Sequence, residues 1–339
     1  MNVLRKILFP FAILYGFITT IRNFLFDKGI LKSTSFDIPI IAVGNLSVGG
    51  TGKTPQIEYL IRLLKDKKKV AVLSRGYKRK TAGFVLLNKT HSSEDVGDEP
   101  LQYFKKFATI NVAVDANRVN GIEQLIQQKT PQIVLLDDAF QHRKVKANFY
   151  ILLTKYSDLY VDDFLLPTGN LRESKRGAKR ANIILVTKCP LNLSEIEQQK
   201  IIKKLNVTAH QKVFFTTISY SENLKGKLEI PLHELPNYEV LLITGIANPK
   251  PLLEFLSSKN INFKHLKFAD HHDFSASEIE TVKKEFHRIS ATKKLMLTTE
   301  KDFVRLSEKL EHLSYLEIET QFLGTQKEKF DTTILKFLN

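Results

Sequence analysis

The chain has 339 residues, of which 43% are hydrophobic and 26% charged, a composition typical of a folded protein with one large or two moderate domains. Its single cysteine, Cys189, excludes an internal disulfide and a cysteine-based metal cluster, and it fits a reducing compartment. The formal net charge of +15 favours an anionic partner (nucleic acid, acidic lipid headgroups or a phosphorylated substrate) over a lysine-rich surface that serves only solubility.

An apolar segment opens the chain, since no residue from Ile7 to Ile21 is charged and basic residues flank this run on both sides. As a helix the run would extend roughly 22 Å, short of the roughly 30 Å hydrocarbon core of a bilayer. A signal peptide needs a small-residue cleavage site, and none is clear before Arg22; a spanning helix needs residues 24–26 as well. A helix lying in the membrane interface fits best, so we predict that residues 1–30 contact a membrane, with a buried core helix as the alternative.

From residue 38 onward, short apolar runs alternate with amphipathic stretches, which predicts an α/β fold with a doubly wound, mostly parallel sheet. The polar, turn-rich stretch 219–237 is the best candidate linker, so we predict a core domain at 31–220 and a smaller α/β lobe at 221–339. The expected strands are 40–43, 70–73, 110–114, 133–136, 149–153, 183–187, 213–219, 240–244, 262–268 and 295–298. The expected helices are 54–65, 99–107, 118–128, 193–204, 251–259, 276–288 and 327–338.

A glycine-rich loop, "VGNLSVGGTGKTP", lies between the first expected strand and the first expected helix of this pattern, as in a P-loop NTPase. Its glycines let backbone N–H groups converge on phosphate oxygens; Lys53 would bridge the terminal phosphates, and Thr54 would hold Mg²⁺. The usual pattern G-x-x-x-x-G-K-[ST] has a glycine where this chain has Ser47, but a serine hydroxyl can itself donate to phosphate. We therefore predict an ATP site rather than a chance glycine-rich turn, formed by Ser47, Val48, Gly49, Gly50, Thr51, Gly52, Lys53 and Thr54.

Two carboxylates, Asp137 and Asp138, end the apolar strand of "IVLLDDAFQHR". A carboxylate in this position can hold Mg²⁺ directly or through water, so we predict a metal site at Thr54, Asp137 and Asp138. The nearest match to the guanine-reading element N/T-K-x-D is "TKCP", which has Pro190 in place of the aspartate and thereby favours ATP.

Three further loops carry polar side chains that suit acid–base chemistry: "EDVGDEP", "LLPTGNLRE" and "FADHHDFS". The first places Asp98 and Glu99 before a helix, the second ends with Arg172, and the third contains His271 and His272. A carboxylate here can take a proton from an attacking hydroxyl, and a histidine can orient it or shift its pKa. The residues alone leave open a helix N-cap role for Asp98, and a metal site or a solvated loop for the histidines.

As a set, "VGNLSVGGTGKTP", "LSRGYKR", "VGDEP", "LLDDAFQH", "LPTGNLRE" and "DHHDF" resemble the motifs of the tetraacyldisaccharide 4′-kinases, the lipid A 4′-kinases of Gram-negative bacteria. The resemblance runs from the apolar N-terminus to past residue 300, and Ser47 is how this family commonly writes its loop. It implies a two-lobed P-loop fold on the cytoplasmic face of the inner membrane. It also implies transfer of the γ-phosphate of ATP, with Mg²⁺, to the 4′-hydroxyl of a tetraacylated glucosamine disaccharide 1-phosphate, giving lipid IVA.

The resemblance further implies roles for individual residues. Asp98 would act as general base, paired with His271, although the adjacent His272 leaves the choice of histidine open; Lys53 completes the catalytic set. We expect a peripheral, monotopic enzyme that is a monomer, touches anionic lipid and binds no nucleic acid. The implied substrate contacts are Arg172, Glu99, Arg75, Arg118 and His142.

Two other functions remain as alternatives. A P-loop ATPase or GTPase switch acting with a macromolecular partner would need no base at Asp98, but the missing guanine-reading aspartate and the apolar leader count against it. A non-enzymatic, basic membrane-surface protein with a vestigial loop is opposed by the intact Lys53, Thr54 and Asp137.

Overall fold

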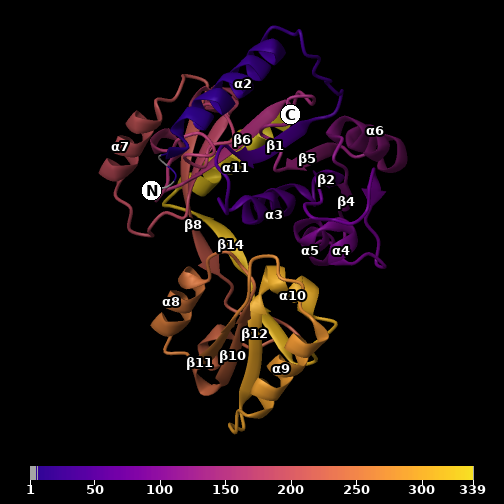
Figure 1. Cartoon of the computed structure of the whole chain (residues 1–339), viewed down its shortest axis with the longest axis vertical. Coiled ribbons are helices and arrows are strands. Elements are labelled where there is room, and N and C mark those ends of the chain that lie inside the picture. Colours follow the sequence, from indigo (N-terminus) through magenta and orange to yellow (C-terminus); the bar gives the residue numbers. More distant parts are fainter. Residues whose placement is uncertain (1–4, 6, 339) are drawn as a thin grey trace.

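Two sheets organise the described part of the chain, residues 5 and 7–338 of a computed structural model (Figure 1). Neighbouring strands of the larger sheet run parallel except at its two edges, where β14 and β3 are antiparallel to β8 and β4. The predicted α/β class, with a doubly wound, mostly parallel sheet and a second, smaller body, is confirmed. In spatial order the strands are β14 (Ile318–Phe322), β8 (Lys212–Tyr220), β7 (Ile183–Thr187), β6 (Phe149–Lys155), β1 (Ile40–Asn45), β5 (Ile133–Asp137), β2 (Val70–Ser74), β4 (Asn111–Val114) and β3 (Val85–Leu86).

Helices cover both faces of this sheet, and for that reason its central strands β1, β5 and β2 are buried along their length and apolar except at their carboxyl ends. In β1, Ile41 and Val43 face one cluster of buried side chains, whereas Ile40 and Ala42 face another. Each such aliphatic side chain stabilises the fold by about 1.5–3 kcal/mol when it leaves water. The helices of the larger body are α3 (Lys53–Leu64), α4 (Ser93–Val96), α5 (Asp98–Lys106), α6 (Arg118–Lys129), α7 (Glu195–Leu205) and α11 (Gln326–Leu338).

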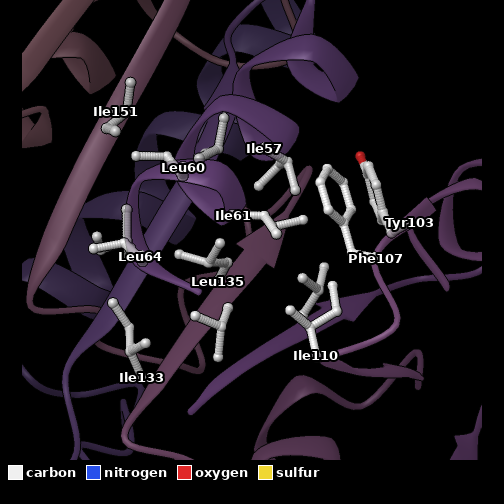
Figure 2. Close-up of a cluster of buried hydrophobic side chains, with 14 of the residues drawn as sticks. Ile57, Leu60, Ile61, Leu64, Tyr103, Phe107, Ile110, Ile133, Leu135 and Ile151 are labelled. Atoms are coloured by element: carbon white, nitrogen blue, oxygen red, sulfur yellow. The ribbon is translucent and has the colours of Figure 1, made fainter. Parts of the chain in front are cut away.

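Helix α3, which follows the glycine-rich loop, is fixed by this core. Figure 2 shows Ile57, Leu60, Ile61 and Leu64 directed at the strands, with Leu135 of β5 among their neighbours. The four side chains of α3 have no exposed surface. Because the helix is held along its length, the loop at its beginning has a fixed starting point.

The smaller body has a five-stranded sheet with helices packed against it. Its strands lie in the order β11 (Phe263–Lys267), β10 (Glu239–Thr244), β12 (Lys294–Thr299), β13 (Leu313–Leu316) and β9 (Lys225–Gly226), and only β9 is antiparallel to its neighbour. Its helices are α8 (Lys250–Ser258), α9 (Ala276–His287) and α10 (Glu300–Leu306).

One predicted boundary needs correction, because the smaller lobe does not run from 221 to the end of the chain. Strand β14 returns to the larger sheet and pairs with β8, and α11 follows it there (Figure 1). Phe330 of α11 is completely buried in the same cluster as α3. The chain therefore crosses between the bodies twice, and the backbone N–H of Ser221 donates to the carbonyl of Glu317 at 3.0 Å where the crossings meet.

The apolar N-terminal segment forms helix α2 (Phe9–Asp27); residues 1–4 and 6 of the predicted segment 1–30 lie outside the described residues. By length and composition α2 could cross a membrane. Its buried face is narrow and made of Ala12, Gly16 and Thr19, and a Cβ on Gly16 would lie 2.6 Å from Leu165 Cδ1. The rest of the helix exposes the large apolar side chains Phe9, Phe11, Ile13, Leu14, Phe17, Ile18, Ile21 and Phe24.

Candidate functional site

The glycine-rich loop lies at the carboxyl end of β1 and at the beginning of α3, as the sequence predicted. Gly49 and Gly52 have φ angles of 105° and 89°, which side chains with a Cβ rarely adopt. Asn45, the last residue of β1, braces the loop: its Nδ2 donates to Thr51 Oγ1 at 3.0 Å. Lys53 Nζ lies 3.5 Å from Asn45 Oδ1, so the lysine folds back over the loop. Such a loop can receive a phosphate chain on its backbone N–H groups and on the Lys53 ammonium, although the N–H groups of Val48 and Thr51 already donate to the carbonyls of Asn170 and Gly49.

The carboxylates Asp137 and Asp138 follow β5, the strand beside β1. Asp137 is buried; its Oδ2 accepts from Ser74 Oγ at 3.3 Å, while its Oδ1 has no hydrogen-bond partner among the described residues. Burial, and then the negative charge of Asp138, raise the pKa of Asp137 to about 6. A buried carboxylate oxygen without a partner is unfavourable unless a cation or a donor binds there, so Asp137 fits the predicted Mg²⁺ site.

Asp138 has cations on two sides. Its carboxylate lies 3.5 Å from Lys53 Nζ and 3.2 Å from Arg172 Nη1. Burial raises the pKa of Asp138, but Lys53 and Arg172 outweigh that effect and hold the pKa below its ordinary value. The structure thus brings the predicted Lys53, Asp138 and Arg172 together at the end of the glycine-rich loop.

Two further lysines, Lys155 and Lys188, flank the loop and were missed in the sequence. A Cβ built on Gly49 would lie 3.7 Å from Lys155 Nζ, and one on Gly50 would lie 4.0 Å from Lys188 Nζ. Lys155 ends β6 and Lys188 follows β7, so both stand at the same sheet edge as the loop. That strand-end position was the available signal, and it places them on the side of β1 opposite to Asp137.

Asp98 and His271 meet across the two bodies. Asp98 is the first residue of α5, and His271 belongs to the loop after β11. The Nδ1 of His271 lies 2.8 Å from Asp98 Oδ2. His272 points elsewhere, with its Nε2 2.9 Å from Glu278 Oε1 at the beginning of α9. Of the two adjacent histidines, the structure therefore brings His271 to Asp98.

Two cations from α10, which the sequence pattern did not predict, complete this cluster. Arg305 donates to both oxygens of Asp98, from Nε at 2.6 Å and from Nη2 at 2.7 Å. Lys301 Nζ lies 2.9 Å from His271 Nε2 and 3.2 Å from Glu99 Oε1. Burial raises the pKa of Asp98, but the hydrogen bond from His271 and the ion pair with Arg305 outweigh it, so this pKa lies below its ordinary value.

Glu99 links this cluster to the carboxylates of β5, because its negative charge also contributes to the raised pKa of Asp137. The Asp98–His271 pair and the end of the glycine-rich loop therefore belong to one electrostatic neighbourhood. Its parts come from the ends of β1 and β5, from the beginning of α5 and from the smaller body.

The predicted residues Arg118 and His142 form a separate group beside Asp137. Arg118 is buried and donates from Nη2 to the carbonyl of Asp137 at 3.3 Å, and its Nε has no partner in the part of the chain that the structure describes. Burial lowers the pKa of Arg118 to about 10, and burial followed by the charge of Arg118 lowers that of His142 to about 4. Arg75 is exposed, and its positive charge contributes to the lowered pKa of both Arg118 and His142. Arg118 Nε, a buried donor without a hydrogen-bond partner among the described residues, suits a site that receives an anion.

Comparisons with known proteins agree over the whole chain. Residues 4–339 match the family model described as tetraacyldisaccharide-1-P 4′-kinase. A tetraacyldisaccharide 4′-kinase from Flavobacterium johnsoniae is 59% identical, with 100% of this chain and 98% of the relative covered, and one from Bacteroides thetaiotaomicron is 46% identical over 99% and 93%. The crystal structure of LpxK from Aquifex aeolicus in complex with ATP has a TM-score of 0.81 and 31% identity, covering 99% of this chain and 100% of that one. The chain belongs to the tetraacyldisaccharide-1-phosphate 4′-kinase family.

Proposed function

We propose that this chain transfers the γ-phosphate of ATP to the 4′-hydroxyl of tetraacyldisaccharide 1-phosphate, forming lipid IVA in lipid A biosynthesis, and that the Asp98–His271 pair activates that hydroxyl. The kinase activity follows from the family, as the sequence predicted. The observation that carries the assignment of the pair is its geometry: a 2.8 Å contact between two bodies, beside a P-loop. A nucleotide-hydrolysing switch with a macromolecular partner needs no such pair and is not favoured.

On the donor side, residues 47–54 hold the phosphates of ATP, with Lys53 at the terminal ones. The residues that would hold Mg²⁺ are Thr54, Asp137 and Asp138, and the partnerless Oδ1 of Asp137 supports that assignment. When bound, the ion supplies positive charge that aligns the terminal phosphates and offsets their developing charge. Arg172, 3.2 Å from Asp138, adds a cation beside the transferred group.

On the acceptor side, the pair removes the proton from the 4′-hydroxyl. The oxygens of Asp98 already accept from Arg305 and from His271, and the lowered pKa of Asp98 makes it a weak base. His271 contacts Asp98 through Nδ1, which leaves Nε2 as the other proton-accepting atom of the pair. We therefore place the proton on His271 Nε2, while Asp98 orients the ring and stabilises the imidazolium; this modifies the base role that the family resemblance implied for Asp98.

In the transfer step, one bond to the γ-phosphorus forms and one breaks. The 4′-oxygen forms a bond to the γ-phosphorus as its proton moves to His271, and the bond from that phosphorus to the β–γ bridging oxygen breaks. The electron pair leaves on ADP. Most of the acceleration comes from alignment and charge neutralisation, to which the base adds about 10²–10⁴-fold.

For the lipid, we assign Arg118, His142 and Arg75 to the substrate's 1-phosphate, because Arg118 Nε is a buried donor without a partner among the described residues and the charges of Arg118 and Arg75 both act on His142. Glu99, 3.2 Å from Lys301, and Arg172, 3.2 Å from Asp138, complete the proposed substrate contacts. Family members act on a lipid disaccharide phosphate, and the cationic surface of this chain, with its net charge of +15, suits such an anion.

We also assign the protein to the cytoplasmic face of the inner membrane, as a peripheral monomer. The support is α2, which exposes 62% of Phe11 and 64% of Phe17 while its narrow small-residue face packs on the core. Tyr15 of α2 donates to the carbonyl of Arg172 at 2.7 Å, so the apolar helix and the active site are neighbours. Such a helix places its apolar face among lipid acyl chains, where the acylated substrate resides.

The test is phosphoryl transfer. The protein is incubated with γ-labelled ATP, Mg²⁺ and tetraacyldisaccharide 1-phosphate in detergent micelles, and the product is analysed for label at the 4′ position. We expect label there with the native chain and strong losses with Lys53→Ala and with Asp98→Asn. The Asp98→Asn variant should still bind ATP, since it lies outside the glycine-rich loop. Release of label only as inorganic phosphate would contradict the proposed function.

A further inference from the structure

Helix α10 carries two cations, Lys301 and Arg305, one turn apart, and both contact the Asp98–His271 pair; Arg305 Nη2 also lies 3.4 Å from His271 Nδ1. Lys301 Nζ lies 2.9 Å from His271 Nε2, whereas Arg305 holds Asp98 through two hydrogen bonds of 2.6 and 2.7 Å. Residues four apart in a helix share one face, so a single face of α10 contacts both.

Arg305 is built into this position. Its side chain is 12% exposed and that of Asp98 is 2% exposed, so the two charges are largely withdrawn from water. The guanidinium also makes a hydrogen bond outside the pair, because Nη1 donates to the carbonyl of His272 at 2.7 Å. Without Arg305, Asp98 would be a buried carboxylate facing one neutral imidazole, and such a group binds a proton more readily.

Lys301 determines which nitrogen of His271 carries the proton. An ammonium only donates, so Nε2, at 2.9 Å, accepts and is unprotonated. The imidazole proton is then on Nδ1, where it donates to Asp98 Oδ2. This tautomer leaves Nε2 as the atom able to accept a proton, which is the form a general base requires.

Lys301 also has alternative partners. Glu99 Oε1 lies 3.2 Å and Asp270 Oδ1 lies 4.0 Å from its Nζ, so the ammonium stays paired when it leaves the imidazole. The Lys301 ammonium, at hydrogen-bond distance from Nε2, occupies the position that the substrate's 4′-hydroxyl must take before it gives its proton to Nε2.

We infer that Lys301 and Arg305 are positioning residues that prepare the Asp98–His271 pair: Arg305 holds Asp98 as a carboxylate, and Lys301 keeps Nε2 of His271 free of a proton until the substrate hydroxyl replaces it. The inference rests on the proposed function and extends it to two residues of the smaller body. The titratable and charged groups that face the pair are Lys301, Arg305 and Asp302 from α10, Glu99 from α5, Tyr77 from the loop after β2, and Asp270, His272 and Asp273 from the loop of His271 itself.

The pH dependence of kcat/KM for the lipid tests this role. Loss of either cation makes the pair bind a proton more readily, so the acidic limb of the profile should move to higher pH by about one unit or more in Arg305→Gln and in Lys301→Gln. Arg305→Lys should recover part of the shift, because one charge remains without the bidentate geometry. The matched control is Arg288→Gln, since Arg288 is 75% exposed and its ion pair is with Glu285, three residues before it in the chain.

A purely structural role predicts a different result, namely lower turnover at every pH with the acidic limb unmoved, and that result would overturn the inference. Should Arg305→Gln fail to fold, the tautomer of His271 in the native chain decides: long-range ¹H–¹⁵N spectra should show the proton on Nδ1, and a proton on Nε2 contradicts the inference. Full turnover by Asp98→Asn would refute the proposed base chemistry itself, whereas an inactive Asp98→Asn with an unshifted Arg305→Gln profile refutes this inference alone.

Discussion

Replacing Lys106 with methionine should destabilise the protein more than any surface change, because this lysine holds three buried carboxylates together. Lys106 Nζ lies 2.6 Å from Glu58, 2.8 Å from Glu300 and 2.5 Å from Glu317. All three glutamates are buried, and one oxygen from each lies within 4.8 Å of the others. They come from α3, from α10 and from the crossing between β13 and β14, so the cluster joins the two bodies.

The magnitude follows from these separations. Two carboxylates 4.8 Å apart repel each other by about 3 kcal/mol at an effective dielectric constant of about 20. Removing one partner from a buried ion pair typically costs about 3–5 kcal/mol, since the remaining charges stay buried. Arg62 and Lys225, each 2.6 Å from Glu317, offset part of the repulsion. We therefore expect Lys106→Met to lower the free energy of unfolding by about 3–5 kcal/mol near pH 8.

The loss should also depend on pH. Burial raises the pKa of Glu58 and raises that of Glu300 to about 7, even with Lys106 present. A carboxyl group whose pKa is raised by folding contributes stability below its unfolded pKa, and that contribution is lost as the pH rises through the folded pKa. Without Lys106 the pKa values rise further, so the deficit of the variant should be small near pH 5 and should grow toward pH 8.

Urea unfolding at both pH values, followed by circular dichroism because the chain lacks tryptophan, measures this deficit. The matched control is Lys105→Met on the same helix, whose side chain is 40% exposed and lies 3.8 Å from Glu308; it should cost under about 1 kcal/mol. Lys106→Met combined with Glu300→Gln should recover part of the loss. An equal deficit at pH 5 and pH 8, or one no larger than that of the control, would refute the reasoning.

Three further predictions concern other parts of the molecule. Phe17→Asp on the exposed face of α2 should abolish sedimentation with anionic vesicles while ATP binding persists, whereas Ile196→Asp, equally exposed on α7, should not; vesicle binding by Phe17→Asp would contradict the proposed anchor. Lys188→Ala should raise KM for ATP several-fold with little change in kcat, against Lys200→Ala as control, in steady-state assays; an unchanged KM would remove Lys188 from the site. Phe330→Ala should lower the free energy of unfolding by about 3–5 kcal/mol, because α11 belongs to the core of the larger body. A loss under about 1 kcal/mol would contradict that placement.

Local signals explain what could be predicted from the sequence. Strands β1 and β5 are continuous apolar runs, and the glycine-rich loop is followed at once by the amphipathic α3, so loop, lysine and carboxylates fall where the pattern indicated. Asp98 and His271 were paired only through the family resemblance, because nothing within either loop reveals that residues 173 positions apart make contact.

The region 300–322 shows why other parts could not be predicted. Helix α10 has 7 residues, and β13 has 4, which is too short for either to display a clear period. Strand β14, "IETQF", alternates with polar residues and resembles a loop. Missing these elements hid Lys301 and Arg305, and it also hid the return of the chain to the larger sheet.

Lys106 was hidden for another reason. A lysine in the last turn of an amphipathic helix is typical of a solvated position that favours the helix dipole. Its three partners come from elements that are distant in sequence, and two of these, around Glu300 and Glu317, belong to the region that carried no signal. Tertiary packing determines where buried ion clusters of this kind form, so a local sequence pattern does not predict them.

The three helices that meet at Lys106 also reach the active site. Helix α3 begins with Lys53 and carries Glu58; α5 begins with Asp98 and ends with Lys106; α10 begins with Glu300 and carries Arg305 near its end. At 1.5 Å per residue, the charge cluster lies about 7–12 Å along the helices from Lys53, Asp98 and Arg305, while Lys301 directly follows Glu300. Because short helices are rigid over such distances, fixing one set of residues fixes the other. The Lys106 cluster therefore sets how the phosphate loop, Asp98 and the α10 cations lie relative to one another, and Lys106→Met should reduce turnover even under conditions where the variant remains folded.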